Sequence, residues 1–298
     1  MGTDQLVAAV ELGGTKSIAL LARGHDILEQ VNVPTATPDE TLGQLQNQLK
    51  TWHAAEPFSA IGIASFGPVQ LQQDQPDFGC MLDTPKPNWS QARVAPVLTE
   101  PFSCPWKFDT DVNGAVLAEY KWGAGMGCNS VCYVTIGTGL GAGFLIGGTP
   151  IHGAMHPEVG HIKTRRAEGD SFGGACPFHG DCIEGLVAGP ALAARFNADM
   201  RTVPDDHPVW QNVAHDIAEL TAIVLLTTSA QRILYGGGVA TLRPFLLPMV
   251  RERVVKNLGS YLPFLDAQSA EEIICAPALG NEAGPRGALA LALAALES

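Results

Sequence analysis

One order of residue types occurs twice in the chain and constrains the fold more than any other feature. An apolar run, a glycine turn and a second apolar run fill residues 6–21, and the same order returns at residues 131–146. Each copy predicts a β-hairpin, because glycine tolerates the positive φ values of a tight reversal and strand-forming residues flank it. A short third strand is expected after each hairpin, near Ile27–Val33 and near Thr149–His152.

Helices and strands alternate after each hairpin. Thr37-Pro-Asp-Glu has the residues of a capping box with proline at the first helical position, which predicts a helix to about Trp52. Apolar residues at helical spacing predict a long helix over Pro208–Ser229. Further strands are expected at 60–64, 107–109, 232–235 and 273–275, and further helices at 113–122, from about 242, and at 285–296.

This order predicts an α/β fold in which a mixed sheet flanked by helices is formed twice. A chain of 298 residues is long enough for two such lobes. Two stretches fit neither half: Ser65–Pro105 is rich in Pro, Asp, Gln and Gly, and His161–Cys182 has His, Cys and Gly with few apolar residues. Long insertions in compact domains usually carry function.

Charge and cysteine content exclude several classes of protein. The chain has 18 Lys and Arg against 30 Asp and Glu, a net charge of −12 without a basic stripe, which argues against a nucleic-acid partner. Its most apolar stretches are too short to cross a bilayer, so no membrane partner is expected. Seven scattered cysteines and no visible targeting segment indicate a reducing compartment, and we expect the cytoplasm.

The two glycine turns are candidate phosphate sites. Gly137-Thr-Gly-Leu-Gly-Ala matches the dinucleotide fingerprint in form, but a strand follows it where that motif requires a helix. A glycine turn between strands can still bind phosphate through backbone N–H groups that point into the bend; the alternative is an ordinary hairpin turn. Each turn carries a threonine beside its glycines, Thr15 and Thr138, and the two hairpins could face each other across a cleft.

Asp111 lies where a predicted strand gives way to a predicted helix. A carboxylate at a strand's end, facing a cleft, can orient a hydroxyl group and accept its proton. The alternative, which the position alone favours, is that Asp111 or Thr110 caps the helix by accepting hydrogen bonds from its free N–H groups.

A second constellation is richer in ligand atoms. Cys176-Pro-Phe-His179-Gly-Asp-Cys182 places three metal-ligating side chains in seven residues, and His161 upstream completes a set of four. Two nitrogen and two sulfur ligands suit a closed, structural Zn²⁺ site. The alternative is a chance loop of small core cysteines and surface histidines. Zinc would stabilise an insertion that lacks an apolar core, because its binding energy becomes local folding energy.

Two glutamates, Glu158 and Glu184, flank this candidate metal loop. On a loop held rigid by a metal, their carboxylates would be accurately placed acceptors for the hydroxyl groups of a sugar. The alternative is that they are solvated surface charges. Lys86 and Asn88, in the segment Thr84–Trp89, could line the other wall of such a site, although turn residues there need no ligand.

These segments together resemble the ROK family of sugar kinases, and within it the zinc-containing bacterial fructokinases. The match covers nearly the whole chain in the family's order: Glu11–Lys16, Ser65–Val69, Thr110–Asn113, Ile136–Gly143, His156–His161, Cys176–Gly185 and Gly236–Val239. Many members of the family have Asp where this chain has Glu11, and Asn where it has Thr110. Both departures resemble the fructokinase branch.

The resemblance implies an actin-like, ribonuclease H-like fold in two lobes. The first lobe would be residues 1–112, with a sugar-side insertion at 65–105 and the closing helix 285–298 returning to it. The second lobe would be residues 113–284, with a zinc-binding insertion at 161–182. ATP with Mg²⁺ and a hexose would meet in the cleft, and a homodimer is the family's expected assembly.

The resemblance also implies a role for each matching residue. Asp111 would be the base that aligns the sugar's primary hydroxyl group for attack on the γ-phosphoryl group. ATP would be bound by Gly13, Gly14, Thr15, Lys16, Gly137, Thr138, Gly139, Pro190, Gly236, Gly237 and Gly238. The sugar would be bound by Gly67, Asn113, Glu158, His161 and Glu184, with His161 also a zinc ligand.

The implied function is ATP-dependent phosphorylation of a hexose, with D-fructose converted to fructose 6-phosphate. Two alternatives stay open: a kinase for mannose, glucose or another hexose, and a non-catalytic sugar-binding regulator on the same fold. An actin-like ATPase or an acetate-type kinase would share the nucleotide site, but neither explains a metal loop flanked by glutamates.

Overall fold

The computed structural model describes residues 4–297, so the ends of the expected segments at Met1–Thr3 and Ser298 lie outside the described residues. The chain divides into two compact units. Unit 1 comprises Met1–Gly123, Thr149–Pro157 and Asn281–Ser298, and unit 2 comprises Ala124–Gly148 and Glu158–Gly280.

The expected second lobe was residues 113–284, and three of its segments, 113–123, 149–157 and 281–284, belong to unit 1. Residues 113–123 belong to unit 1, because their helix packs on the C-terminal helix of that unit. The chain also returns to unit 1 for the short segment Thr149–Pro157 before it completes unit 2.

The sheet of unit 1 has the order β3-β2-β1-β4-β5. Its strands are β1 (Leu6–Leu12), β2 (Lys16–Arg23), β3 (Asp26–Pro34), β4 (Ile61–Ser65) and β5 (Trp106–Thr110). The first three strands are antiparallel neighbours, as the hairpin pattern predicted, whereas β4 and β5 run parallel to β1. The sheet is therefore mixed, and three parallel strands end at the same edge.

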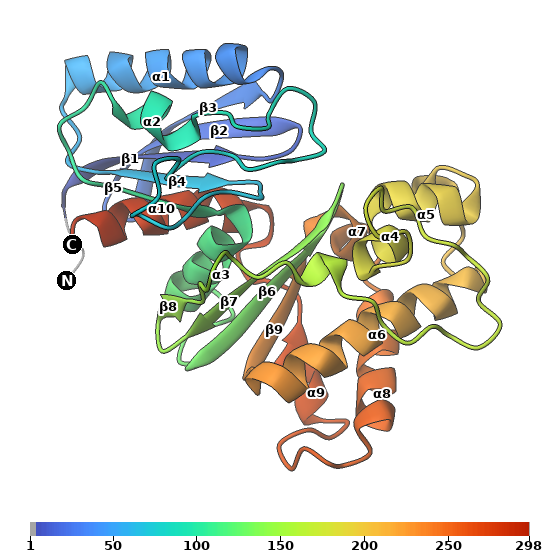
Figure 1. Cartoon of the computed structure of the whole chain (residues 1–298). Helices are drawn as coiled ribbons and strands as arrows, with labels where there is room; N and C mark the ends of the chain where they lie inside the picture. Colours follow the sequence, from blue (N-terminus) through green and yellow to red (C-terminus); the bar gives the residue numbers. More distant parts are fainter. Residues whose placement is uncertain (1–3, 298) are drawn as a thin grey trace. The chain divides into compact units, whose positions relative to one another are not determined.

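Helices cover both faces of this sheet (Figure 1). The helices of unit 1 are α1 (Pro38–Ala55), α2 (Val94–Thr99), α3 (Asp111–Trp122) and α10 (Ala283–Ala295). The expected capping box is present at α1, where Thr37 and Glu40 cap each other. On the other face, α10 packs on β1, β4 and β5, and it approaches so closely that a Cβ on Gly62 would lie 2.0 Å from the carbonyl oxygen of Ala288.

The insertion at 65–105 contributes to the core of unit 1. Trp89 and Met81 are fully buried, and the only helix among its residues, α2, packs against α1. The sequence did not predict α2. Its six residues include Pro96, and no side chain caps its N-terminus, so tertiary burial of Val94 and Leu98 stabilises it.

The sheet of unit 2 repeats the same plan. Strands β6 (Ser130–Ile136) and β7 (Leu140–Ile146) form the predicted hairpin, and β9 (Arg232–Gly236) and β10 (Ile274–Cys275) lie parallel to β6 on its other side. The order is β10-β9-β6-β7, and the fifth strand of the sheet, β8 (Thr149–Pro150), is the segment with which the chain returns to unit 1.

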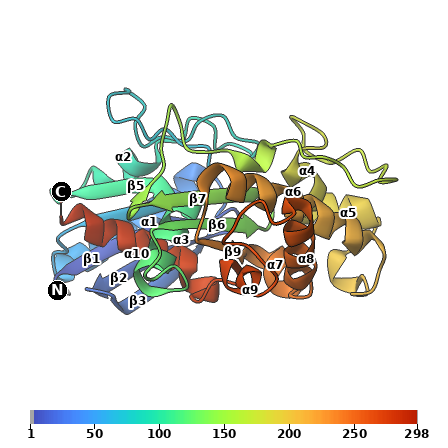
Figure 2. The ribbon, with the colours of Figure 1, turned by 90° about the horizontal axis from the view of Figure 1, so that it is seen from below.

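The helices of unit 2 include the long predicted one. They are α4 (Ile183–Val187), α5 (Gly189–Phe196), α6 (Val209–Thr228), α7 (Gly237–Leu242), α8 (Leu246–Leu258) and α9 (Ser269–Ile273). Short 3₁₀ turns are η1 (Val159–His161), η2 (Met200–Thr202) and η3 (Gly280–Glu282), the last of which passes into unit 1. Helices α6 and α8 lie side by side in both views (Figures 1 and 2). The helix expected from about residue 242 begins earlier, because Gly237 and Gly238 open α7 directly after β9.

Within the part of the chain that the structure describes, we find no helix with the length and apolar character that a bilayer crossing requires.

Candidate active site and metal centre

The candidate residues of unit 1 gather where its parallel strands end. The register aligns Leu12 of β1, Ser65 of β4 and Thr110 of β5 in one row. The residues that follow each of these ends are the turn 13–16, the loop that contains Gly67, and Asp111. Because the carboxyl ends of parallel strands meet at one sheet edge, segments far apart in the sequence become neighbours there.

Asp111 is the first residue of α3, and it is not the residue that caps the helix. Thr110 is the N-cap, since its Oγ1 accepts a hydrogen bond from the N–H of Asn113 at 3.1 Å. The Asp111 carboxylate accepts a bond from the N–H of Val112 at 2.9 Å. Burial raises the pKa of Asp111 to about 7 despite this bond. A carboxyl group with that pKa suits proton transfer near neutral pH.

Glu11, near the end of β1, is the electrostatic neighbour of Asp111. Burial raises the pKa of Glu11 to about 7, the negative charge of Asp111 adds to the rise, and Lys16 opposes it. Glu11 also lies close to α10, where a Cβ on Gly284 would be 2.1 Å from its Oε1. The negative charge of Asp111 therefore disfavours ionisation of Glu11.

Asn113 and Asp109 are buried and form a polar cluster with His152, which is exposed. Asp109 is 4% exposed; its Oδ1 accepts a bond from Asn113 Nδ2 at 2.7 Å, and its Oδ2 lies 2.9 Å from His152 Nε2. The hydrogen bond to Asp109 raises the pKa of His152. Asn113 Oδ1 is buried and has no hydrogen-bond partner within the described residues. An unpaired buried acceptor of this kind suits a ligand hydroxyl group.

Gly67 lies against the second histidine of this region. A Cβ on Gly67 would be 3.3 Å from His156 Cε1, and the Nε2 of His156 accepts a bond from the N–H of Val69 at 3.1 Å. Burial lowers the pKa of His156, which favours the neutral ring that this bond requires. His156 thereby holds the loop that contains Gly67.

The first glycine turn, residues 13–16, has its carbonyl groups occupied by the protein. Thr35 Oγ1 donates to the carbonyl of Gly13 at 2.8 Å, and the Thr35 N–H donates to the carbonyl of Thr15 at 3.0 Å. Among residues 4–297, nothing forms a hydrogen bond with the N–H groups of Gly14 and Thr15, and both residues are exposed. Such free N–H groups are what a phosphate-binding turn requires.

The second glycine turn, residues 137–140 of unit 2, is held in a similar way. The carbonyl of Gly137 accepts a bond from the N–H of Gly189 at 2.7 Å, which places Pro190 and the first turn of α5 beside it. Within the described chain, the N–H groups of Thr138 and Gly139 have no hydrogen-bond partner.

The glycines at 236–238 lie beside the second turn. The register pairs Gly236 with Thr135 on neighbouring parallel strands. A Cβ on Gly236 would be 2.2 Å from the hydroxyl of Tyr133, and one on Gly237 would be 2.5 Å from the carbonyl oxygen of Ile136. These two glycines are therefore required by packing, whereas Gly238 is exposed and has open space around it.

The two glutamates beside the metal loop differ in their surroundings. The Oε2 of Glu184 accepts a hydrogen bond from the N–H of Leu140 at 3.0 Å, so this carboxylate is attached to the second glycine turn. Glu158 is exposed, and its carbonyl accepts the N–H of His161 in η1. Neither contact tests whether the carboxylate binds a sugar. Both residues belong to unit 2.

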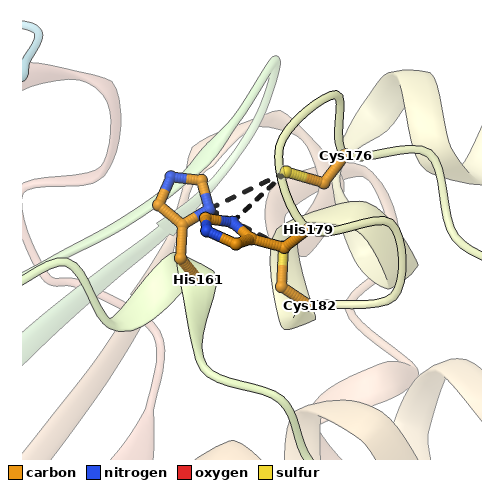
Figure 3. A group of neighbouring side chains, drawn as sticks. All are labelled: His161, Cys176, His179 and Cys182. Atoms are coloured by element: carbon orange, nitrogen blue, oxygen red, sulfur yellow. Dashed lines mark hydrogen bonds between the residues drawn. The ribbon is translucent and has the colours of Figure 1, made fainter.

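The four predicted metal ligands meet in one cluster of unit 2. Figure 3 shows the side chains of His161, Cys176, His179 and Cys182 pointing toward one another, and their nearest ligand atoms all lie within 4.8 Å of one another. The His161 Nδ1 is 3.6 Å from the Sγ of Cys182 and 3.9 Å from that of Cys176, and the His179 Nδ1 is 3.8 Å from the Sγ of Cys176.

This geometry fits zinc. With Zn–S bonds of about 2.3 Å and Zn–N bonds of about 2.0 Å, neighbouring ligands of a tetrahedral site lie about 3.5 Å apart. Reciprocal backbone bonds between Cys176 and Gly180, at 3.1 and 2.9 Å, close the loop so that His179 turns back toward Cys176. Gly180 has φ +64°, a conformation that glycine adopts without strain.

The sequence analysis did not predict several contacts within these sites. Asp109 and Asn113 are four residues apart at a helix start, a spacing that could have suggested their contact. Nothing in the sequence links Asp109 to His152 or Val69 to His156, which are 43 and 87 residues apart. Glu11 appeared only as a departure from the family pattern.

Known proteins match this chain over nearly its full length. A family model described as the ROK family matches residues 7–295. The fructokinase of Zymomonas mobilis is 40% identical over 297 residues, which is 98% of this chain and 97% of that protein. The fructokinase of Pediococcus pentosaceus is 36% identical over 98% of this chain and 99% of its own. The structure of a ROK hexokinase from Thermus thermophilus matches with a TM-score of 0.77 and 25% identity, covering 98% and 99% of the two chains.

The likeness to that structure confirms the expected fold class, an actin-like sugar kinase fold with a mixed sheet in each lobe. Together with the match over residues 7–295, it shows that the chain belongs to the ROK family.

Proposed function

We propose that this protein is a fructokinase that transfers the γ-phosphoryl group of MgATP to D-fructose and forms fructose 6-phosphate. The choice of fructose is supported by the relatives named fructokinase, which match nearly the whole chain at up to 40% identity. The observation that carries the chemistry is Asp111, a half-buried carboxyl group with a pKa raised to about 7 at the end of a parallel strand.

Asp111 would act as the base. Its carboxylate would accept the proton of the sugar's primary hydroxyl group while that oxygen attacks the γ-phosphorus and the bond to ADP breaks. Phosphoryl transfer has a loose transition state, so alignment of the hydroxyl and neutralisation of phosphate charge carry most of the catalysis. Asn113, with its unpaired Oδ1, and Gly67 would contact the sugar in unit 1, and Glu158, Glu184 and His161 would do so from unit 2.

The glycine turns would bind the phosphates of ATP. In the first turn, Gly14 and Thr15 would supply free N–H groups and Lys16 an ammonium charge, while Gly13, whose N–H is bonded to the carbonyl of Lys16, would shape the turn around the phosphate. In the second turn, Thr138 and Gly139 would supply free N–H groups and Thr138 a hydroxyl group, while Gly137, whose N–H is bonded to the carbonyl of Gly139, would shape the turn. Gly238 and Pro190, both exposed, would border the adenosine, while Gly236 and Gly237 keep that strand end close to the second turn.

We propose that the cluster of His161, Cys176, His179 and Cys182 binds a structural Zn²⁺ ion. Four protein ligands leave no open position for chemistry, so the ion would supply rigidity alone. Because the Nδ1 of His161 faces the sulfur atoms, the Nε2 on the other side of the ring is the atom that would contact a sugar hydroxyl group.

One assay tests this function against its alternatives. ADP release by the purified protein would be measured with fructose, mannose, glucose and N-acetylhexosamines at several concentrations. We expect fructose to have the highest kcat/KM, with release that requires both Mg²⁺ and sugar. Preference for another hexose would correct the substrate, and sugar binding without ADP release would indicate a non-catalytic regulator.

We also propose how the protein assembles and where it works. The assembly would be a homodimer, which sedimentation velocity tests directly. The protein would work in the cytoplasm without a nucleic-acid or membrane partner, as the net charge of −12 and the seven free cysteines suggest.

A further inference from the structure

The ammonium group of Lys86 is bound to the back of the first glycine turn. Its Nζ donates a hydrogen bond to the carbonyl oxygen of Gly14 at 2.7 Å and a longer one to that of Thr35 at 3.4 Å. Lys86 comes from the insertion at 65–105, 72 residues after the turn. Lys86 takes no part in the reaction proposed above.

The surroundings of Lys86 form a site for a cation. Its Nζ lies 5.8 Å from the centre of the Phe66 ring and 6.0 Å from that of Trp89, distances at which an aromatic face attracts an ammonium group. Trp89 is fully buried, contacts Phe66 edge to face, and donates its Nε1–H to the carbonyl of Ala36 at 2.8 Å. These contacts hold Lys86 against the turn.

The bond to Gly14 orients a peptide group. In a trans peptide the C=O of one residue and the N–H of the next point in opposite directions. When Lys86 holds the carbonyl of Gly14 on one side, the N–H of Thr15 must point to the other. That N–H has no hydrogen-bond partner among the described residues.

All four carbonyl groups of the turn are occupied in this way. Thr35 donates hydrogen bonds to the carbonyl groups of Gly13 and Thr15, and Lys86 donates one to that of Gly14. The N–H of Gly13 donates to the carbonyl of Lys16. A carbonyl oxygen that rotated toward a bound phosphate would repel it. Because the carbonyl groups are occupied, they do not rotate toward a phosphate. The free N–H groups of Gly14 and Thr15 therefore stay directed to the side on which an anion would bind.

We propose that Lys86 is a positioning residue for nucleotide binding: it fixes the Gly14–Thr15 peptide so that the Thr15 N–H is directed at a phosphate group of ATP. This inference rests on the proposed kinase function and adds a residue to it. Lys86 acts through the turn, so its loss weakens nucleotide affinity and leaves sugar affinity nearly unchanged.

Three variants test the proposal in the full-length protein. Lys86→Met keeps an unbranched apolar side chain against Phe66 and Trp89 but removes the charge and both hydrogen bonds. Lys86→Arg keeps a cationic donor. Lys50→Met removes an equal charge from α1, where the Nζ of Lys50 donates a hydrogen bond to Gln46 Oε1 on the surface, and serves as the matched control. Calorimetry with Mg²⁺ and AMPPNP, without sugar, measures nucleotide affinity.

We expect Lys86→Met to weaken AMPPNP binding about tenfold, the loss typical of a hydrogen bond to a charged group. The KM for fructose should change less than twofold, Lys86→Arg should recover part of the affinity, and Lys50→Met should bind as the wild type does. Unchanged AMPPNP affinity in Lys86→Met, or a rise confined to the KM for fructose, would overturn the proposal.

A spectroscopic readout tests the orientation of the peptide itself. Protein labelled with ¹³C at glycine carbonyls and ¹⁵N at threonine gives signals from the four Gly-Thr pairs of the sequence: 2–3, 14–15, 137–138 and 148–149. Lys86→Met should shift the 14–15 signal before any nucleotide is added and leave the 137–138 signal in place. An unmoved 14–15 signal combined with lost affinity would mean that Lys86 contacts the nucleotide directly, which contradicts a positioning role.

The outcomes also separate this inference from the proposed function. A wild-type protein that fails to bind AMPPNP would overturn both. A wild-type protein that binds AMPPNP and phosphorylates fructose, with Lys86→Met equal to it, would overturn the role of Lys86 alone.

Discussion

The Oε2 of Glu184 accepts a hydrogen bond from the backbone N–H of Leu140 at 3.0 Å. Glu184 lies two residues after the candidate metal ligand Cys182, and Leu140 closes the second glycine turn. From the other side, Gly160 is so close to this turn that a Cβ on it would be 2.1 Å from the carbonyl oxygen of Leu140. Gly160 precedes the candidate metal ligand His161. Two segments that carry candidate metal ligands therefore hold one turn in place.

The first prediction concerns Glu184. We expect Glu184→Ala to weaken AMPPNP binding about tenfold, because the turn loses a charged acceptor. Glu184→Gln keeps an oxygen that can accept the Leu140 N–H, so its nucleotide affinity should be closer to the wild type, although its KM for fructose should rise. Glu168→Ala, at an exposed position of the same unit, is the control. If Glu184→Ala raises only the KM for fructose, the turn does not depend on this carboxylate.

The second prediction concerns the base. Asp111→Asn keeps the size of the side chain but cannot accept a proton, so kcat should fall by about 10²–10⁴ while fructose and AMPPNP still bind. Stopped-flow or coupled assays measure the rate, and calorimetry measures binding. A variant that retains a near-normal kcat would remove Asp111 from the mechanism.

The pH dependence of the reaction gives a third prediction. A base works in its deprotonated form, so with a pKa of about 7 for Asp111 the kcat/KM should rise with pH below 7 and level off above it. Glu11→Gln removes the neighbouring negative charge and should move the rise to lower pH. A pH profile that stays flat between pH 5 and 8 would contradict the raised pKa.

The same raised pKa predicts a stability effect with a definite sign. Between the unfolded value near 4 and the folded value of about 7, the folded protein binds more protons at Asp111 than the unfolded chain does. Stability from this group therefore falls as pH rises through that window, and the loss is complete above pH 7. Asp111→Asn removes the loss, so its Tm at pH 8 should exceed that of the wild type by about 2–4 °C for each kcal/mol recovered.

Calorimetric scans at pH 5 and pH 8 check this sign. The advantage of Asp111→Asn should be larger at pH 8 than at pH 5. An advantage that shrinks with rising pH would show that Asp111 is stabilised as a carboxylate in the folded protein.

The metal cluster gives a fourth prediction. Purified wild-type protein should contain about one zinc ion per chain by elemental mass spectrometry, and Cys182→Ser should contain almost none, because a serine hydroxyl is a poor zinc ligand. Limited proteolysis should then cut the loop at 164–182 faster. Cys128→Ser, a half-buried thiol outside the cluster, should keep its zinc. Wild-type protein with well under one zinc per chain would contradict the site.

A buried ion pair in unit 2 gives the fifth prediction. Arg195 and Asp216 are 2% and 0% exposed and lie 2.8 Å apart, and Arg195 also binds Asp170 in the insertion. Arg195→Met leaves both acids without this partner, which should cost about 3–5 kcal/mol of unfolding free energy in urea titrations. Adding Asp216→Leu should recover part of the loss.

An exposed pair provides the control for this measurement. Arg201 and Asp199 form a bridge on the surface, and Asp199→Asn should change the unfolding free energy far less than Arg195→Met does. Equal losses in the two pairs would mean that burial does not set the energy of the Arg195 bridge.

The sequence by itself determined the local elements and the candidate metal cluster. The hairpin at 6–21, the capped helix from Thr37 and the long helix at 208–229 follow from glycine placement, capping residues and apolar spacing, which act between residues close in the chain. The four candidate metal ligands, which the structure brings together, were also recognisable, because three of them lie within seven residues.

Only the tertiary structure decided which distant residues meet. Strand register brings Glu11 within electrostatic reach of Asp111, and packing of the insertion brings Lys86 to Gly14. It also showed which of two residues caps α3, since the side chain of Thr110, and not that of Asp111, accepts the bond from the N–H of Asn113. Contacts across 72 or 100 residues depend on how sheets align and how faces pack, and no local preference of the chain encodes that alignment.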